Sequence, residues 1–297
     1  MGRNRLKKSS GRSDEISGRK TVIEPNGKNF QYWKDIWRYR ELALNLAKRD
    51  ITVRYKQTVI GLGWSIISPI VNMLIMSFIF GSVAHLESDG SAPYSIMVYA
   101  GIIPWTLFSK NFTITSSTFL SSAALMKKVY FPRIISPIGA SFAALIDSVI
   151  SFAVLLLIIL ISYFLNGFTP CWRLALVPVF FTLPIILGFF TGLFLSPFNI
   201  RFRDLNQAIP FLLQIGQYAT PVAYSFAVAC AAVPEQIRFI YELNPIAGAI
   251  NAVRWCIIPD NAFHWKSFIS TLVCIAVFIP VGIKAFRKGE RTFVDLV

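Results

Sequence analysis

The chain has 297 residues, of which 55% are hydrophobic, 14% aromatic and only 15% charged. A water-soluble domain could not bury that much apolar surface, so the composition excludes an ordinary soluble protein and predicts one that crosses a membrane several times. The net charge of +14 would also suit a nucleic-acid-binding protein, but the placement of the basic residues, described below, argues against that class.

Residues 1–29 form a basic leader that is polar and rich in serine and glycine. It has too few large apolar side chains to build a core, so we predict that it is disordered. The first long apolar run starts only near Gly61, which argues against a secretory signal. The stretch Gly18-Arg19-Lys20-Thr21 resembles only the end of a phosphate-binding loop, and no nucleotide-binding motif occurs in the sequence.

Residues 30–57 have the pattern of an amphipathic helix. Apolar residues recur at spacings of three and four, and charged residues occupy the other face. The apolar positions are Trp33, Ile36, Trp37, Leu44, Ala47 and Ile51. A cationic amphipathic helix with tryptophans is typical of a helix that lies among lipid headgroups, and the alternative is a soluble helix that packs on a partner.

Six apolar runs follow, and each is long enough to cross a hydrocarbon core of about 30 Å as a helix. They are residues 61–82, 94–118, 138–165, 174–196, 208–229 and 267–285. Only helices satisfy every backbone group in lipid without closing a barrel, so the predicted fold class is an all-α polytopic membrane protein. Its domain of six transmembrane helices would span residues 58–286.

Residues 230–266, between the fifth and sixth runs, contain two shorter apolar stretches, residues 237–243 and 246–258, that prolines interrupt. Neither stretch is long enough to span a membrane. Two short re-entrant helices that enter the membrane from outside and return fit this pattern, a form that is tolerated when it is buried in protein. The alternative is an amphipathic cap that lies flat on the outer surface.

The basic residues between the runs set the orientation, because they concentrate on the cytoplasmic side of a membrane protein. With the amino terminus inside, the inner segments contain Lys127, Lys128, Arg133, Arg201, Arg203, Lys284, Arg287, Lys288 and Arg291. The outer segments contain only Arg173, Arg238, Arg254 and Lys266. Both termini are therefore predicted to be cytoplasmic, with residues 287–297 as a cytoplasmic tail, and the net charge is a topology signal that also attracts anionic membrane lipids.

A basic hinge, residues 120–138, separates the second and third runs. Its apolar side chains, Leu125, Met126, Val129, Tyr130 and Phe131, alternate with Lys127, Lys128 and Arg133 at helical spacing, and Pro132 ends this predicted short helix. Such a helix, held between two spans, could receive motion from a soluble partner. The alternative is a loop whose lysines bind lipid phosphates.

Three charged positions stand out within the apolar regions. Asp147 lies inside the third run and is either a functional carboxylate or a structural partner at a helix contact. The pair Arg203-Asp204 either braces a cytoplasmic gate or marks the membrane boundary. Arg254 either binds a phosphate or an acidic sugar at the outer mouth, or extends to the headgroups.

Other side-chain chemistry is sparse. His85 and His264 have no ligand set around them, and the four cysteines, Cys171, Cys230, Cys256 and Cys274, have no metal or redox spacing, so no metal site is expected. Aromatic side chains such as Trp105 and Tyr218 could pack on sugar rings, or could belong to helix contacts and interfacial belts.

Several stretches, taken together and in order, resemble the type-2 ABC exporter permeases that move polysaccharides, namely the O-antigen, capsule and teichoic-acid exporters. The resemblance runs from about Tyr39 to the end of the last run and excludes the leader. The matching stretches are Arg54-Tyr55-Lys56-Gln57-Thr58-Val59-Ile60-Gly61 with Trp64 and Pro69, Ala100-Gly101-Ile102-Ile103-Pro104-Trp105, Lys127-Lys128-Val129-Tyr130-Phe131-Pro132-Arg133, Arg201-Phe202-Arg203-Asp204-Leu205, Pro221-Val222, Leu243-Asn244-Pro245 and Arg254-Trp255.

This resemblance implies a homodimer that exports a lipid-linked polysaccharide across the bacterial plasma (inner) membrane, driven by separate ATPase subunits that bind ATP and Mg, with no cofactor on this chain. It also implies roles for individual residues. The coupling helix would be Lys127, Lys128, Val129, Tyr130, Phe131, Pro132 and Arg133, with Tyr130 and Phe131 as anchors in the ATPase. The interface helix would include Trp33, Ile36, Trp37 and Arg40, the cytoplasmic gate Arg203 and Asp204, and the outer gate Asn244, Pro245 and Arg254.

Three other functions compete with polysaccharide export. A drug or lipid exporter permease of the same superfamily is the nearest. A membrane glycosyl or acyl transferase would need paired acids, a histidine base or a metal set near one membrane face, whereas the runs offer the carboxylate of Asp147 and no histidine. A secondary transporter would show internal repeats, and the two halves of the chain are not similar. The sequence therefore predicts a transport subunit and not an enzyme.

Overall fold

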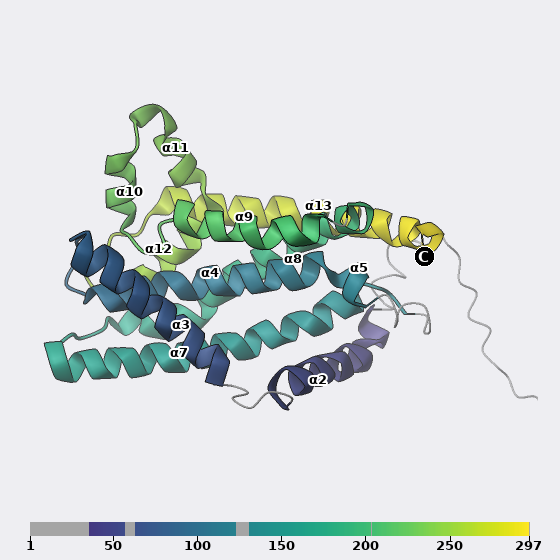
Figure 1. The fold of residues 1–297 in the computed structure, drawn as a ribbon, viewed down its shortest axis with the longest axis horizontal. Helices are drawn as coiled ribbons and strands as arrows, with labels where there is room; N and C mark the ends of the chain where they lie inside the picture. Colours follow the sequence, from purple (N-terminus) through teal and green to yellow (C-terminus); the bar gives the residue numbers. More distant parts are fainter. Residues whose placement is uncertain (1–35, 57–62, 123–130, 203, 297) are drawn as a thin grey trace, which may run out of the picture.

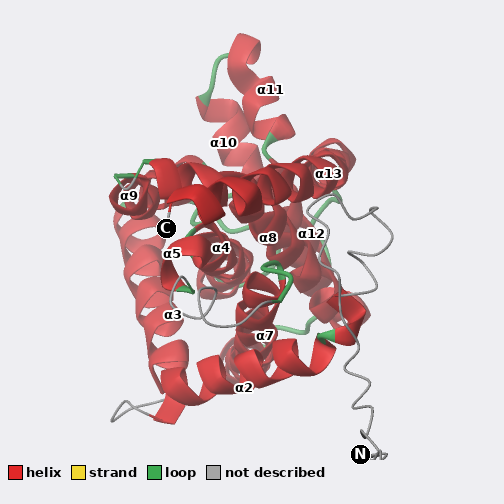
Figure 2. Ribbon diagram, turned by 90° about the vertical axis from the view of Figure 1, so that its right-hand side faces the viewer, coloured by secondary structure: helices red, strands yellow, loops and turns green. Residues whose placement is uncertain are grey.

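The computed structural model describes residues 36–56, 63–122, 131–202 and 204–296, and these residues form helices and connecting turns without any strand (Figures 1 and 2). In chain order the elements are α2 (Arg40–Lys56), α3 (Gly63–Met76), the π-helical η1 (Ser77–Val83), α4 (Tyr94–Ser116), α5 (Thr118–Ser121), α7 (Ile135–Asn166), the 3-10 helix η2 (Trp172–Leu176), α8 (Val177–Arg201), α9 (Leu205–Ala219), α10 (Phe226–Ala232), α11 (Glu235–Leu243), α12 (Pro245–Ile257) and α13 (Trp265–Leu296). The predicted all-α class is confirmed.

Four helices within the described residues are long and apolar enough to cross a membrane: Gly63–Val83, Ile135–Asn166, Trp172–Arg201 and Trp265–Glu290. They correspond to the first, third, fourth and sixth predicted runs. The second run forms α4, but polar residues in its second half make it less apolar than the other four. The chain is thus a multi-pass membrane protein with four candidate spans.

The fifth predicted run, residues 208–229, is not one helix, and this prediction is wrong. Helix α9 ends at Ala219, Thr220 is extended, and α10 begins only at Phe226. The cause is Pro221, which lacks an N–H donor and forces the preceding residue out of the helical conformation.

Helix α4 runs through the middle of the bundle, between α3, α7, α8 and α12 (Figure 2). Its polar residues Asn111, Thr115 and Ser116 are buried in protein, and Asn111 Nδ2 donates a hydrogen bond to the Ile185 carbonyl of α8, at 3.1 Å. A Cβ atom at Gly188 of α8 would lie 2.5 Å from the Phe108 carbonyl oxygen, so only glycine permits this close approach of the two helices.

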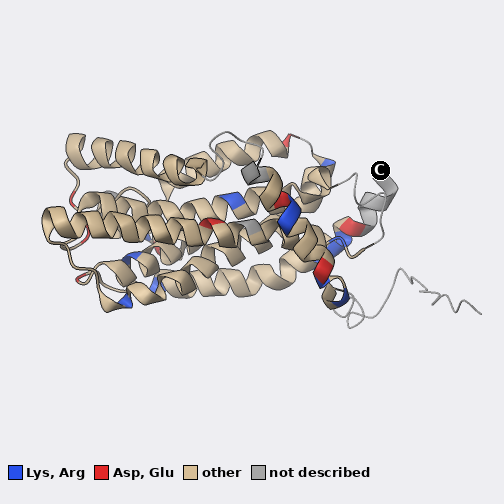
Figure 3. Cartoon of the chain, turned by 90° about the horizontal axis from the view of Figure 1, so that it is seen from below, with Lys and Arg blue, Asp and Glu red and all other residues tan. Residues whose placement is uncertain are grey.

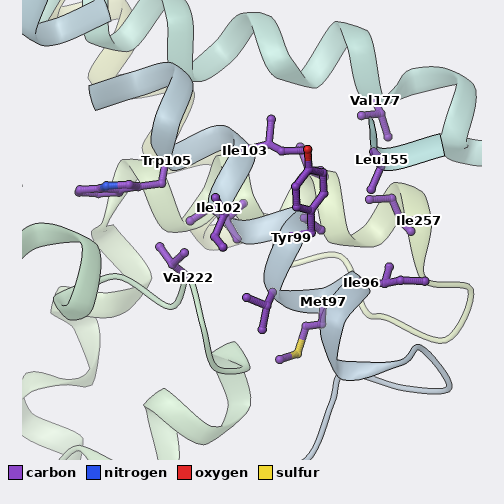
Figure 4. Close-up of a cluster of buried hydrophobic side chains, with 14 of the residues drawn as sticks. Ile96, Met97, Tyr99, Ile102, Ile103, Trp105, Leu155, Val177, Val222 and Ile257 are labelled. Atoms are coloured by element: carbon purple, nitrogen blue, oxygen red, sulfur yellow. The ribbon is translucent and has the colours of Figure 1, made fainter. Parts of the chain in front are cut away.

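The larger apolar core surrounds the first half of α4 (Figure 4). Ile96, Tyr99 and Ile103 of α4 are almost completely buried there. They pack with residues from three other elements, including Leu155 of α7, Val177 of α8 and Ile257 of α12.

Charged residues lie mostly towards the two ends of the bundle, with few between them (Figure 3). At the α10 end, α10 and α11 project as a pair of short helices (Figure 1). Helices α11 and α12 match the two predicted stretches 237–243 and 246–258, and α12 is buried along nearly its whole length. Such burial does not fit a cap lying flat on the surface. At the α2 end, α2 packs against the start of α7.

Candidate functional site

The predicted coupling segment is only partly within the described residues. Lys127, Lys128, Val129 and Tyr130 lie outside them, whereas Phe131, Pro132 and Arg133 lie just before α7. The Phe131 side chain is only 4% exposed and packs inside its own chain. The prediction that Phe131 is an anchor for the ATPase therefore needs correction, because a buried ring cannot also insert into a partner.

Phe131 belongs to a second apolar cluster at the α2 end, which we call the Phe286 cluster. Its buried members are Ala43, Leu46, Phe119, Phe131, Ile134, Ile135, Leu193 and Phe286. The rings of Phe119 and Phe286 are nearly parallel, with their centroids 4.6 Å apart. Residues from α2, α5, α7, α8 and α13 therefore meet around residues 131–135 of the hinge.

The end of α13 also holds the hinge through polar contacts. The Arg133 backbone N–H donates to Glu290 Oε1 at 3.2 Å, and Arg133 Nη1 donates to the Glu290 carbonyl oxygen at 2.5 Å. Residues 287–297 were expected to be a tail beyond the last span, but α13 continues without a break to Leu296. Sequence reasoning missed this contact, because Glu290 lies 157 residues from Arg133.

The interface helix is only partly described, because Trp33 lies outside the described residues and Ile36 to Tyr39 precede α2. Ile36 packs against the Phe286 cluster, and Trp37 is 70% exposed, with the Arg40 guanidinium 5.2 Å above its ring. A crevice of about 220 Å³ lies between residues 36–44 and the start of α7. It is lined by Ile36, Trp37, Arg40, Ala43, Leu44, Ile135, Ile138 and Phe142. The amphipathic pattern thus places one face against α7 and leaves Trp37 outside.

Only one residue of the predicted cytoplasmic gate pair lies within the described residues. Asp204 is exposed at the start of α9, and Arg203 lies outside the described residues, so their ion pairing stays a prediction. A neighbouring contact was missed by sequence reasoning: Asn199 Nδ2 donates to Asn206 Oδ1 at 2.8 Å and to the Ser116 carbonyl at 3.0 Å. The turn between α8 and α9 is thereby attached to α4.

At the α10 end, Asn244 and Pro245 begin α12. Asn244 Oδ1 accepts hydrogen bonds from the N–H groups of Ile246 and Ala247, and Pro245 occupies the first helical position, where its missing N–H has no cost. Asn244 Nδ2 donates to Thr220 Oγ1 at 3.1 Å, and Thr271 Oγ1 donates to the Pro245 carbonyl at 2.7 Å. The two predicted gate residues therefore connect the end of α9 with α12 and α13.

Arg254 is completely buried within the protein, so both predicted roles, an exposed anion site and a side chain extending to headgroups, are wrong. Its Nε donates to the Met97 carbonyl at 3.3 Å, and its Nη2 donates to the Val222 carbonyl at 2.8 Å. Its Nη1 donates to the Tyr224 carbonyl at 3.0 Å and lies 3.5 Å from Asp89 Oδ2. The guanidinium thus joins the start of α4 to the α9–α10 turn.

Gly101 makes this junction possible. A Cβ atom there would lie 2.3 Å from the Val222 carbonyl oxygen and 3.0 Å from Arg254 Nη2. Only a glycine lets the α9–α10 turn approach α4 closely enough for both to bind the same guanidinium.

A groove of about 540 Å³ opens between α3, α4 and α9. Its lining is Ser65 from α3, Trp105, Ser109, Lys110, Thr113 and Ile114 from α4, and Pro210, Leu213, Gln214 and Gln217 from α9. Seven of these ten side chains carry a polar group, while most of the exposed surface of the groove is apolar. An apolar lining with a few polar groups is typical of a ligand site.

An ion pair lies at the wall of this groove. Lys110 Nζ is 3.3 Å from Asp147 Oδ2 of α7, and Ser65 Oγ donates towards Asp147 Oδ1 at 3.5 Å. The expectation that Asp147 has a partner at a helix contact is confirmed. Sequence reasoning missed Lys110, although it is the one charged residue in the run 94–118, and an opposite charge in a neighbouring span is the expected partner of a membrane carboxylate.

Among the described residues, no group of three or more histidine, cysteine, aspartate or glutamate side chains could hold a metal ion. His264 packs its ring on Phe226, with a centroid distance of 4.7 Å. The sites described above are therefore junctions between helices and a groove with several polar side chains. None of them brings catalytic acids and bases together in the part of the chain that the structure describes.

Comparison with known proteins adds a family and several relatives. The sequence profile of the ABC-2 type transporter family matches residues 41–258. Two proteins of Klebsiella pneumoniae described as O-antigen export system permease protein RfbA are 26% identical over 262 residues and 27% identical over 266 residues, and each alignment covers 86% of this chain and 95% of the relative. A Myxococcus xanthus protein of the same description is 27% identical over 265 residues, covering 89% of this chain and 98% of the relative.

Proposed function

The chain belongs to the ABC-2 type transporter family, and we propose that it is the permease subunit of an ATP-driven exporter that moves a lipid-linked polysaccharide across the bacterial plasma membrane. The observation that carries this proposal is the similarity, over 86–89% of the chain, to three permeases of O-antigen export. A permease of an ABC exporter implies an ATPase subunit as its partner, and we propose that ATP and Mg bind there.

In the proposed topology, α4 and α9 add two crossings to the four candidate spans, and both termini are cytoplasmic. Helix α4 has 23 residues and is therefore about 35 Å long, enough to cross the hydrocarbon core. Helix α9 is shorter, at about 22 Å for its 15 residues, and the buried turn at residues 220–223 continues the crossing. Irregular backbone is tolerated at membrane depth when protein surrounds it, and the same principle supports the buried α12 as a re-entrant helix, with α11 as the helix that leads into it.

The groove between α3, α4 and α9 supports a homodimer. It is open on one side of the single chain, and the helices at its rim expose large apolar side chains, including Trp64 of α3 and Phe211 and Tyr218 of α9. Two copies that face each other across this side would close two grooves into one path, and would cover apolar side chains that otherwise contact lipid.

The Phe286 cluster supports the proposed route of coupling. ATP binding would move the ATPase subunits, and the segment Lys127–Arg133 would pass that motion to the spans. Phe131 and Arg133 attach the end of this segment to α13, and α13 packs along α8 and α12. A displacement at the α2 end would therefore reach the α10 end through continuous helices.

Deletion of the gene in its host tests the proposed function. We expect the surface polysaccharide to disappear and its lipid-linked precursor to accumulate inside the cell, and a plasmid copy to restore export. Accumulation of a drug or a lipid without any glycan would instead indicate the related exporter class. Turnover of a lipid-linked sugar donor by the purified chain, without an ATPase, would indicate a transferase.

The orientation can be tested through Cys171. A membrane-impermeant maleimide added to intact cells is expected to label Cys171, and to do so faster than Cys230. Hydrogen bonds from the backbone and side chain of Arg173 lower the pKa of the Cys171 thiol, whereas burial raises the pKa of the Cys230 thiol. The thiolate is the reacting form, and near pH 7 a larger fraction of Cys171 than of Cys230 is thiolate. The difference between the two labelling rates should therefore narrow as the pH rises.

Single-cysteine variants measured by mass spectrometry would give the two labelling rates. Labelling of Cys171 only after the cells are permeabilised would reverse the proposed orientation. A rate ratio that does not change with pH would contradict the pKa order of the two thiols.

A further inference from the structure

We propose that Lys110 binds an anionic group, a phosphate or a carboxylate, on the molecule that passes through the groove between α3, α4 and α9. The inference rests on the proposed export function and adds the chemical class that the groove recognises. Among the described residues that line the groove, Lys110 is the only charged one. A passing anion therefore meets a single cation on an otherwise neutral wall.

The ion pair of Lys110 and Asp147 is strongly asymmetric. The Asp147 side chain is only 4% exposed, whereas the Lys110 side chain is 38% exposed. An ammonium group has three N–H donors, and among the described residues Asp147 provides the one acceptor for Nζ. Two donors of Lys110 are thus available on the side of the groove.

The depth of this pair in the membrane argues against a purely structural role. Lys110 lies about 9 Å before the end of α4, which the short α5 then follows, and Asp147 lies about 18 Å beyond the start of α7, so both charges lie inside helices of the bundle and away from its α2 end. A charge at that depth is unfavourable in lipid, and apolar residues of similar volume often stabilise a helix contact as well as a buried ion pair does. A partly exposed cation at that depth, on the wall of a groove, is placed to bind an anion there.

The neighbouring side chains sort into donors and acceptors. Ser109 Oγ donates to the Thr106 carbonyl at 3.2 Å, and Thr113 Oγ1 donates to the Ser109 carbonyl at 2.8 Å, so these hydroxyls offer the groove only their lone pairs. Lys110, the indole N–H of Trp105 and the amides of Gln214 and Gln217 on α9 remain as donors, and of these only Lys110 carries a charge. Lone pairs suit the hydroxyl groups of a sugar, and the donors suit its anionic groups.

Asp147 keeps this site weak. An anion that binds Lys110 must compete with a carboxylate that is already 3.3 Å from Nζ. A translocation path needs contacts that are favourable enough for entry and weak enough for release. Asp147 positions the ammonium and limits how long an anion remains bound.

The test uses the complete permease with its partner ATPase in lipid nanodiscs, and measures binding of two pairs of probes by competition. Farnesyl pyrophosphate is compared with farnesol, as an anionic and an uncharged lipid. A galacturonate oligosaccharide is compared with its methyl ester, as an acidic and a neutral glycan. We expect the wild-type protein to prefer the anionic member of at least one pair, and the pair concerned identifies the lipid anchor or the sugar as the source of the charge.

Lys110→Gln is expected to reduce that preference about tenfold or more, since it removes a charge-assisted hydrogen bond. Lys110→Arg keeps the cation and should keep the preference, and Asp147→Asn should increase it. The double variant Lys110→Gln with Asp147→Asn removes both charges of the ion pair, so it should melt like the wild type and still lack the preference. Lys266→Gln is the matched control, because Lys266 forms an ion pair of the same 3.3 Å length with Glu242 at the α10 end, away from the groove.

A wild-type protein without preference for either anionic probe overturns the inference. So does a double variant that keeps the full preference, because Lys110 would then act only in helix packing. The gene-deletion experiment tests the proposed function separately. If deletion abolishes export, the proposed function stands even when the inference about Lys110 fails. If the deletion strain keeps all of its surface glycan, the proposed function itself is refuted.

Discussion

Replacement of Arg254 with methionine is expected to lower the free energy of unfolding by about 3–5 kcal/mol, the range found when one partner of a buried, hydrogen-bonded charge is removed. The guanidinium is completely buried and binds the carbonyls of Met97, Val222 and Tyr224, besides Asp89. Methionine fills a similar volume but leaves these acceptors without a donor, and unsatisfied buried acceptors are costly.

Thermal and denaturant unfolding in detergent would measure the loss, together with the yield of monodisperse protein. Arg254→Lys should be intermediate, because one ammonium cannot reach acceptors in the three directions that the planar guanidinium serves. Arg238→Met is the matched control at the same end of the bundle: Arg238 is half-buried and donates from Nε to the Cys230 carbonyl at 3.0 Å. Similar stability of Arg254→Met and Arg238→Met would show that the buried guanidinium does not hold the α9–α10 turn against α4.

Truncation of Phe286 to alanine is expected to abolish export while the complex continues to hydrolyse ATP. Phe286 is completely buried, and its ring stacks on Phe119 in the cluster that holds Phe131. Removing a buried phenylalanine side chain typically costs about 3–5 kcal/mol and leaves a cavity. With that cavity, the end of the coupling segment could move without moving α13.

Export per ATP hydrolysed, measured in proteoliposomes that contain both subunits, is the decisive quantity. Phe286→Leu retains most of the volume and should recover most of the coupling. Val277→Ala, an exposed position on the same helix, is the control and should behave like the wild type. An unchanged ratio of export to hydrolysis in Phe286→Ala would exclude the Phe286 cluster from the coupling route.

Local features of the fold were predictable because they depend on residues that are close in sequence. The long apolar runs became helices, since a helix is the one local structure that satisfies its own backbone in lipid. Asn244 and Pro245 begin α12 as a cap and a first-turn proline, both of which are local signals. The break in the fifth run was also predictable from the sequence, because Pro221 lies within the run. It was overlooked because the run as a whole is apolar.

Which charged and aromatic residues contact one another was decided by the tertiary structure, although the charge of Lys110 made it a candidate partner for Asp147. Asp147 pairs with Lys110, 37 residues earlier, and Arg254 reaches acceptors that lie from 30 to 165 residues away. Phe131 turns inward to Phe286, where the sequence suggested a surface anchor. Periodicity defines which face of a helix is apolar, but both lipid and protein can cover that face. The sequence by itself thus determined where the helices form and what they contain, and only their packing decided which side chains meet, because that depends on the relative rotation and height of helices far apart in the chain.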